Sequence, residues 1–288
     1  MLAIAAATVE KRAMRQLKLR RPSLLKLRAK LTKRLARFLR QQARSIADQI
    51  NLKRATMGKL TEDQQRIVDE TLDAIDFSGW SILVGDVQDI FDEIVKDGSY
   101  AALAQIDFDT EADPGVAGII NAAAYDYASA RSAELVGMKR LETGALVDNP
   151  DAEWAITDST RDGLRQSVAD AIDQGWSNDR LAEEIEGAYA FSDERAMVIA
   201  RTETNMASNS GALSGYKASG VVEQKIWLTA EDDLVDEEEC GPNGDQGPID
   251  LNDAFQSGDD APPAHPNCRC VLAPVITQAD EAVSGDEE

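Results

Sequence analysis

The sequence predicts a mainly α protein with a long basic N-terminal helix, a helical body, and a small α+β C-terminal module with a loop-rich end. Apolar residues recur at three- and four-residue steps through much of the first 220 residues, which is the period of amphipathic helices. Aromatic residues make up only 5% of the chain, so its core must consist largely of aliphatic side chains. Six of the nine prolines fall between residues 242 and 274, which indicates loops there.

These patterns divide the chain into four expected segments. Residues 1–60 form a basic amphipathic helical arm, and residues 61–157 form a helical body. Residues 158–276 form the C-terminal module, and residues 277–288 are an acidic tail that we expect to be disordered because it is short of apolar side chains.

Length and hydropathy bound the class of protein. A chain of 288 residues is long enough to bury a substantial core. No stretch approaches the ~18 consecutive apolar residues of a transmembrane helix, so we expect no membrane span. The apolar start precedes the charges at Lys11 and Arg12, whereas a secretory signal has its charges first. We therefore expect a protein that is cytoplasmic when it is synthesised.

Charge is distributed very unevenly along the chain. Residues 1–60 hold 17 of the 30 Lys and Arg residues and 2 of the 52 acids, a net charge of +15. Residues 61–288 hold the other 13 basic residues and 50 acids, a net charge of −37. Such asymmetry predicts a basic segment with a polyanionic or acidic partner, and the acidic remainder confines any DNA contact to that segment. The alternative is that the basic segment neutralises the protein's own acidic body.

The basic segment is predicted to contain one amphipathic helix over residues 23–50, with Ser23 as its N-cap after Pro22. Its apolar stripe consists of Leu24, Leu27, Leu31, Leu35, Phe38, Leu39, Ile46 and Ile50. Its candidate partner- or DNA-binding residues are Arg28, Lys30, Lys33, Arg34, Arg37 and Arg40. We expect the stripe to dock on another protein while the basic side chains face a polyanion; packing on the rest of the chain is the alternative.

Further helices are predicted along the rest of the chain. Thr61 begins the first of them, and another runs from about Trp80 until Gly98 interrupts it. The segment 107–115 is a loop, followed by an Ala-rich helix over residues 118–138. Two short helices then join at residues 175–177, with Ser177 as the N-cap of the second. Ser192 caps a longer helix that ends at Gly220, and residues 223–229 resemble a β-strand.

All three cysteines and the only histidine lie within 31 residues, at Cys240, His265, Cys268 and Cys270. Thiolate and imidazole are preferred ligands of tetrahedral zinc, and a small loop-rich fold gains stability from such a metal. The spacing departs from paired zinc knuckles, because Cys240 has no second cysteine two or three residues away. The cluster has three interpretations: structural zinc, three reduced thiols, or a disulfide. A cytoplasmic origin disfavours the disulfide.

Catalysis at this cluster is not favoured by its pattern. Zinc deaminases place a glutamate two residues after the histidine, whereas Pro266 and Asn267 follow His265 here. No phosphate-binding loop, GxSxG motif or dinucleotide-binding fingerprint occurs in the chain. The sequence therefore predicts a protein that is not an enzyme.

The C-terminal half carries several motifs in a recognisable order. They are the run Ala200–Glu203 (ARTE), Gly220-Val221, Lys225–Trp227 (KIW) and His265–Cys270 (HPNCRC). In this order they resemble the phage Mu F-like family of head-morphogenesis proteins, over roughly residues 160–276. One departure is that Gly241, Pro242 and Asn243 follow Cys240, where many relatives have a second cysteine, so that four-ligand zinc would need His265.

The resemblance implies a minor structural protein of a tailed-phage head. Its implied partners are the portal and other head proteins, with DNA as a further partner of the arm, and its implied location is the virion interior near the portal vertex. Arg201, Glu203 and Trp227 are then structural residues of the motif, and we expect Arg201 to bond to the following loop region. The alternative is an ADP-ribosyl- or nucleotidyl-type transferase on the C-terminal module.

Overall fold

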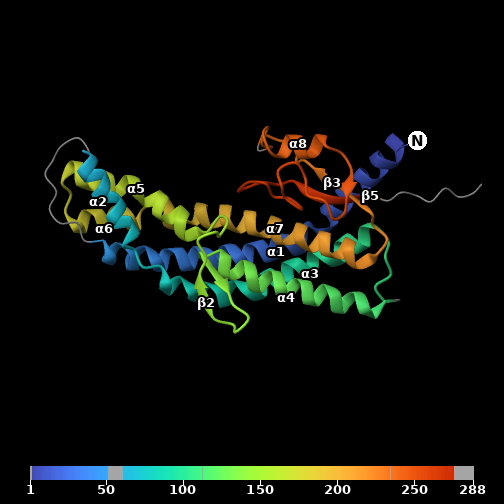
Figure 1. Cartoon of the computed structure of the whole chain (residues 1–288), viewed down its shortest axis with the longest axis horizontal. Helices are drawn as coiled ribbons and strands as arrows, with labels where there is room; N and C mark the ends of the chain where they lie inside the picture. Colours follow the sequence, from blue (N-terminus) through green and yellow to red (C-terminus); the bar gives the residue numbers. More distant parts are fainter. Residues whose placement is uncertain (1, 51–60, 112, 234, 276–288) are drawn as a thin grey trace, which may run out of the picture.

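The computed structural model describes residues 2–50, 61–111, 113–233 and 235–275, with side chains from residue 22 onward. It is an elongated bundle of long helices that carries a small sheet near one end (Figure 1). The mainly α fold with a small C-terminal strand module is confirmed. The predicted acidic tail, residues 277–288, lies outside the described residues. In the part of the chain that is described, no helix combines the length and apolar character needed to cross a bilayer.

Four helices form the long body of the bundle. They are α1 (Leu2–Gln49), α3 (Ile82–Gln105), α4 (Pro114–Glu134) and α7 (Asp193–Ser219). Three shorter helices lie at one end: α2 (Glu62–Asp73) packs on α5 (Ile156–Gln174), which packs on α6 (Asn178–Glu186), and α6 packs on α1. Two short 3-10 helices, η1 (Ser78–Ser81) and η2 (Tyr189–Phe191), lead into α3 and α7.

The strands form two small antiparallel sheets. A hairpin of β1 (Met138–Arg140) and β2 (Leu146–Asp148) follows α4 and was not foreseen. The second sheet has the order β4-β3-β5, from β3 (Gln224–Leu228), β4 (Ile249–Asp250) and β5 (Val271–Val275). It lies beside α7 together with the short helix α8 (Cys240–Asp245) (Figure 1). Trp227 packs edge-to-face on Phe255 at a centroid separation of 5.2 Å beneath this sheet.

The predicted helix starts are largely confirmed. The side chains of Thr61, Ser177 and Ser192 accept hydrogen bonds from backbone N–H groups in the first turns of α2, α6 and α7. α7 ends at Gly220, whose left-handed conformation (φ 65°) suits a glycine. The prediction that Ser23 is an N-cap is wrong, because α1 begins earlier and continues through Pro22. The Ser23 Oγ instead donates a hydrogen bond to Asp97 Oδ1 at 3.1 Å.

Helix α1 is a central part of the bundle core. Six residues of its predicted stripe are buried, and Leu24 and Leu27 pack partly buried against the same core; the six are Leu31, Leu35, Phe38, Leu39, Ile46 and Ile50. The helix contacts α3, α6 and α7. The expectation that this stripe docks on another protein is therefore wrong: the chain's own helices cover it, so residues 24–50 are not a separate arm.

Helices α3 and α7 approach each other closely at a point where glycines face each other. A Cβ atom on Gly211 would lie 2.2 Å from the Val95 carbonyl oxygen, and one on Gly98 would lie 2.5 Å from that of Ser208. Ser99 Oγ donates across this contact to the Gly211 carbonyl at 2.8 Å. The prediction that Gly98 interrupts the helix is therefore wrong: α3 runs unbroken, and the glycine permits close backbone approach.

Gly211→Ala is expected to destabilise the protein by about 1–3 kcal/mol or more, because the new methyl group meets backbone atoms that cannot rotate away. Thermal or denaturant unfolding measures the loss. Gly85→Ala, on α3 but with open space around the new Cβ, is the matched control and should be neutral or stabilising by up to about 1 kcal/mol. Equal effects of the two substitutions would contradict the close crossing.

Candidate functional site

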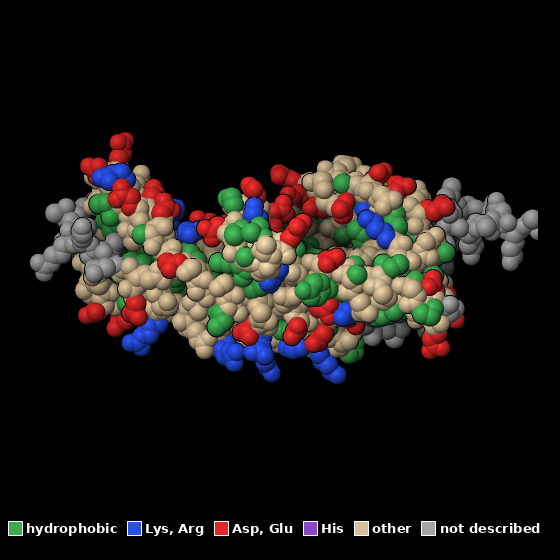
Figure 2. Space-filling model, turned by 60° about the horizontal axis from the view of Figure 1, so that its bottom comes forward, with side chains coloured by type: hydrophobic (Ala, Val, Ile, Leu, Met, Phe, Trp, Pro, Cys, Tyr) green, Lys and Arg blue, Asp and Glu red, His purple; other side chains and the backbone are tan. Residues whose placement is uncertain are grey.

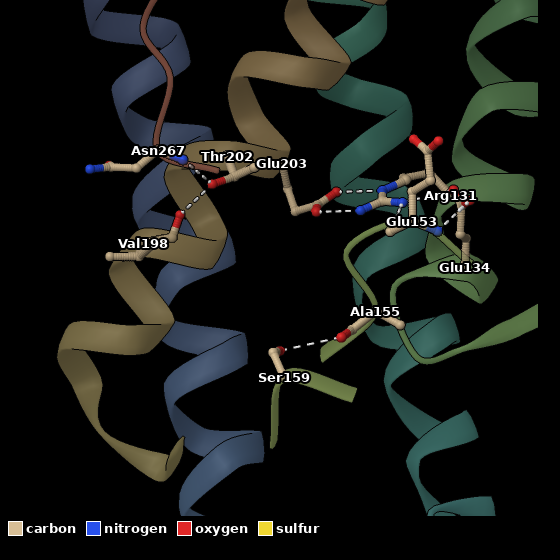
Figure 3. A network of polar contacts seen from close by, with 9 residues as sticks. All are labelled: Arg131, Glu134, Glu153, Ala155, Ser159, Val198, Thr202, Glu203 and Asn267. Carbon is tan, nitrogen blue, oxygen red and sulfur yellow. Dashed lines mark hydrogen bonds and ion pairs between the residues drawn. The ribbon is translucent and has the colours of Figure 1, made fainter. Parts of the chain in front are cut away.

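Polar side chains on one face of α7 hold the segment that contains the clustered cysteines. Arg201 Nη1 donates to Asn267 Oδ1 at 2.7 Å, and Asn267 N donates to Thr202 Oγ1 at 2.9 Å. Figure 3 shows Thr202 between Asn267 and the Val198 carbonyl, to which its own hydroxyl donates. The run that includes Arg201 thus places two consecutive side chains on the loop before β5.

The same contact continues one and two turns further along α7. Asn205 Nδ2 donates to the carbonyl oxygens of Cys268 (3.1 Å) and Cys270 (3.2 Å). Asn209 accepts from Leu272 N at 2.9 Å through its Oδ1 and donates to the Cys270 carbonyl through its Nδ2. These amides pair backbone groups that would otherwise be buried without partners, and they fix the position of both cysteines relative to the bundle.

Glu203 points away from this loop, into the bundle. Its carboxylate accepts two hydrogen bonds from Arg131 of α4, from Nε at 2.9 Å and from Nη2 at 2.8 Å. Arg131 is 4% exposed and Glu203 is 2% exposed. Arg131 also donates to Glu134 Oε2 and to the Glu153 carbonyl, so one guanidinium joins α4, α7 and the segment before α5 (Figure 3).

Electrostatics keeps this buried arginine charged. Burial by itself lowers the pKa of Arg131, but attraction and hydrogen bonding by the Glu203 carboxylate outweigh burial and raise the pKa above its ordinary value. The neighbouring Tyr127 hydroxyl has its pKa raised, first by burial and then by Glu203. Sequence reasoning found Glu203 but missed Arg131, whose partner is 72 residues away and leaves no local pattern.

Three of the four predicted metal ligands come together in the structure. The sulfurs of Cys240, Cys268 and Cys270 all lie within 4.8 Å of one another and are buried. Cys240 and Cys268 have their sulfurs 3.6 Å apart, and all three cysteines are free thiols rather than disulfide partners. Helix α8 begins at Cys240, while the segment entering β5 supplies the other two.

The environment of the thiols differs from one to the next. A hydrogen bond from the Cys268 thiol lowers the pKa of Cys270 to about 6, and the indole of Trp227 and the backbone of Ala230 act in the same direction. Its bond to Cys270 raises the pKa of Cys268, while burial raises that of Cys240 to about 11. One thiolate is thus favoured near neutral pH, and a bound cation would favour all three.

His265 lies outside this group of sulfurs. Its Nδ1 contacts the Pro266 carbonyl at 2.9 Å, and its Nε2 is buried with no hydrogen-bond partner among the described residues. The three thiols fit three corners of a tetrahedral zinc site by donor type, spacing and burial. The fourth corner is not formed by His265 in this arrangement.

Four of the six candidate basic residues of α1 form ion pairs with acids of the same chain. Lys30 Nζ lies 2.8 Å from Glu93, Arg34 and Arg37 lie 3.9 and 4.0 Å from Asp86, and Arg40 pairs with Asp193. Arg28 is half-buried and Lys33 is exposed. Figure 2 shows Lys and Arg side chains as a row along one edge of the molecule. We call the six candidate residues of α1 the basic row, and the ion pairs of four of them partly neutralise it.

Fold and site together define a helical protein whose bundle is locked to a small cysteine-bearing module. Residues 162–273 match the sequence model of the Phage Mu protein F like family. This segment, which includes α7 and the loop that α7 holds, is therefore similar to the Mu F-like proteins of phage heads. No curated protein and no solved structure gives a significant match.

Proposed function

We propose that the protein is a minor structural component of a tailed-phage head that associates with the portal and assists head assembly and DNA packaging or delivery. The observation that carries this proposal is the family match over residues 162–273, which spans α7 and the loop it holds. The proposed location is the virion interior near the portal vertex. The elongated helical bundle, with the C-terminal module hydrogen-bonded to α7, suits a protein that connects other head proteins.

The basic row of α1 is the proposed contact surface. Its apolar stripe is already buried in the chain, so binding there must be mainly electrostatic. An acidic surface of the portal or of another head protein is the first proposed partner, and DNA is the second. The acidic remainder of the chain, with a net charge of −37 over residues 61–288, disfavours DNA contact elsewhere.

The test is co-elution of the full chain with the assembled portal ring of the same phage. We expect a complex that weakens as salt rises and is weakened by the double substitution Lys33→Glu and Arg37→Glu, two exposed positions of the basic row. Lys139→Glu, exposed on β1, is the control. Separate elution of ring and chain at low salt would contradict the proposal. Sequence-independent binding to DNA that falls steeply with salt would instead identify the second partner.

The proposed role is not enzymatic. A transferase built on Arg201 and Glu203 would need the two side chains to meet one substrate. Arg201 instead bonds to Asn267, while Glu203 is buried against Arg131 on the other side of α7. Turnover of a nicotinamide dinucleotide that is lost in Arg201→Ala would contradict this role.

We further infer that zinc is the metal that the three thiols hold, and that its role is to close the C-terminal module. Support comes from the sulfur spacing and from the small apolar cluster around them, which gains stability from a metal crosslink. Elemental analysis of protein purified without chelator should give about one zinc per chain. Absence of metal, with all three thiols titratable after denaturation, would reject it.

A further inference from the structure

We infer that His265 Nε2 becomes the fourth ligand of this metal site when the imidazole ring turns toward the three sulfurs. The inference rests on the proposed zinc and concerns the coordination that completes it. Three thiols leave one corner of a tetrahedron open, and a structural zinc site fills all four corners with protein atoms.

The protonation state of His265 follows from its contact with the backbone. A carbonyl oxygen can only accept a hydrogen bond, so the 2.9 Å contact with the Pro266 oxygen requires the proton to be on Nδ1. In the neutral imidazole, Nε2 then carries the lone pair. Zinc-binding histidines have this pattern, in which the nitrogen that does not bind metal donates to a carbonyl or carboxylate.

Nε2 is also a buried acceptor without a partner. Its surface is covered, and no described residue donates a hydrogen bond to it. Leaving a buried acceptor unpaired costs free energy, which a metal bond would offset. A bound metal therefore accounts for an arrangement that the protein atoms alone leave unsatisfied.

A backbone hydrogen bond links His265 to one of the thiol ligands. Cys268 N donates to the His265 carbonyl at 3.3 Å, so the histidine and one thiol ligand belong to the same tight turn. The imidazole also interacts electrostatically with Asp236, whose carbonyl accepts a hydrogen bond from Gly241, next to Cys240. His265 thus interacts with both segments that supply the thiols, and its ring must move toward the sulfurs to bind.

Asp236 is the competing oxygen ligand from the neighbouring segment. Its Oδ1 already accepts hydrogen bonds from the backbone N–H groups of Glu238 (2.8 Å) and Glu239 (2.9 Å). Those bonds hold the carboxylate in its own turn. His265 Nε2 accepts no hydrogen bond from the described residues, so it is the better candidate for the fourth ligand.

Cobalt(II) titration of the full chain tests the inference, because cobalt reports tetrahedral coordination by its visible absorption. We expect the native chain to bind cobalt tetrahedrally and His265→Ala to lose affinity by more than the roughly 10–100-fold typical of losing an outer-shell partner. His265→Cys, which restores a ligand atom, should recover tetrahedral binding. Asn252→Ala, exposed in the same module, is the control and should bind as the native chain does.

The outcomes separate this inference from the zinc proposal. If His265→Ala keeps the affinity and spectrum of the native chain, the fourth ligand is not His265, whereas the three-thiol site stands. If the native chain binds neither cobalt nor zinc, the metal proposal itself fails. Circular dichroism of each variant shows whether the helices are intact, so that loss of binding is not mistaken for unfolding.

Discussion

Deletion of residues 1–55 is expected to abolish folding rather than to release a soluble body. The deletion removes nine buried hydrophobic residues from the bundle core, and six of them have side chains larger than alanine. Truncating a single such side chain to alanine typically costs about 2–5 kcal/mol, whereas a whole domain is stable by only about 5–15 kcal/mol. Circular dichroism and gel filtration should show loss of cooperative unfolding and aggregation. A monomeric truncated chain that unfolds cooperatively would contradict the packing of α1.

A matched pair of substitutions on α1 isolates this effect from the loss of charge. Leu35 is fully buried, so Leu35→Ala should cost about 2–5 kcal/mol of unfolding free energy. Leu25 is 43% exposed on the same helix, so Leu25→Ala should change stability by about 0.5 kcal/mol or less. Denaturant unfolding measures both variants.

Glu203→Gln is expected to destabilise the fold by about 3–5 kcal/mol, because it leaves the Arg131 guanidinium buried without its opposite charge. The glutamine keeps the size of the side chain but can accept only part of the paired hydrogen bonding. Denaturant unfolding at neutral pH measures the loss, and the protein should still bind metal wherever it remains folded.

Glu134→Gln provides the control for this pair. Glu134 also bonds to Arg131 but is 32% exposed, so water compensates for the lost charge and the effect should be about 1 kcal/mol or less. Replacing both buried charges, as in Arg131→Met with Glu203→Leu, should recover much of the stability lost in Glu203→Gln. If Glu203→Gln lowers the free energy of unfolding no more than Glu134→Gln does, the ion pair of Arg131 and Glu203 is not buried as described.

The sequence predicted the helices better than it predicted what they pack against. The spacing of Leu31, Leu35 and Ile46 correctly indicated a buried face, but an amphipathic pattern does not identify the surface that buries it. Similarly, the charges of the basic row were evident from composition. Their pairing with Asp86, Glu93 and Asp193 required the fold, since those acids lie on α3 and at the start of α7.

Long-range contacts explain the other errors. Gly98 has the sequence pattern of a helix break, but in the fold it packs closely against Gly211 of α7. The cysteines were assigned to one cluster because they lie close together in the sequence, and the structure brings their sulfurs together. The hairpin of β1 and β2 was missed because strands of three residues are too short to show an alternating pattern.

The most direct test of the proposed head function is the composition of the particles themselves. Quantitative mass spectrometry of purified virions from the phage that encodes this chain should detect it at a small fraction of the major capsid protein. Heads assembled without the chain should fail to package or deliver DNA normally. Virions that lack the protein altogether, or a phage that produces fully infectious particles when the chain is absent, would contradict the account.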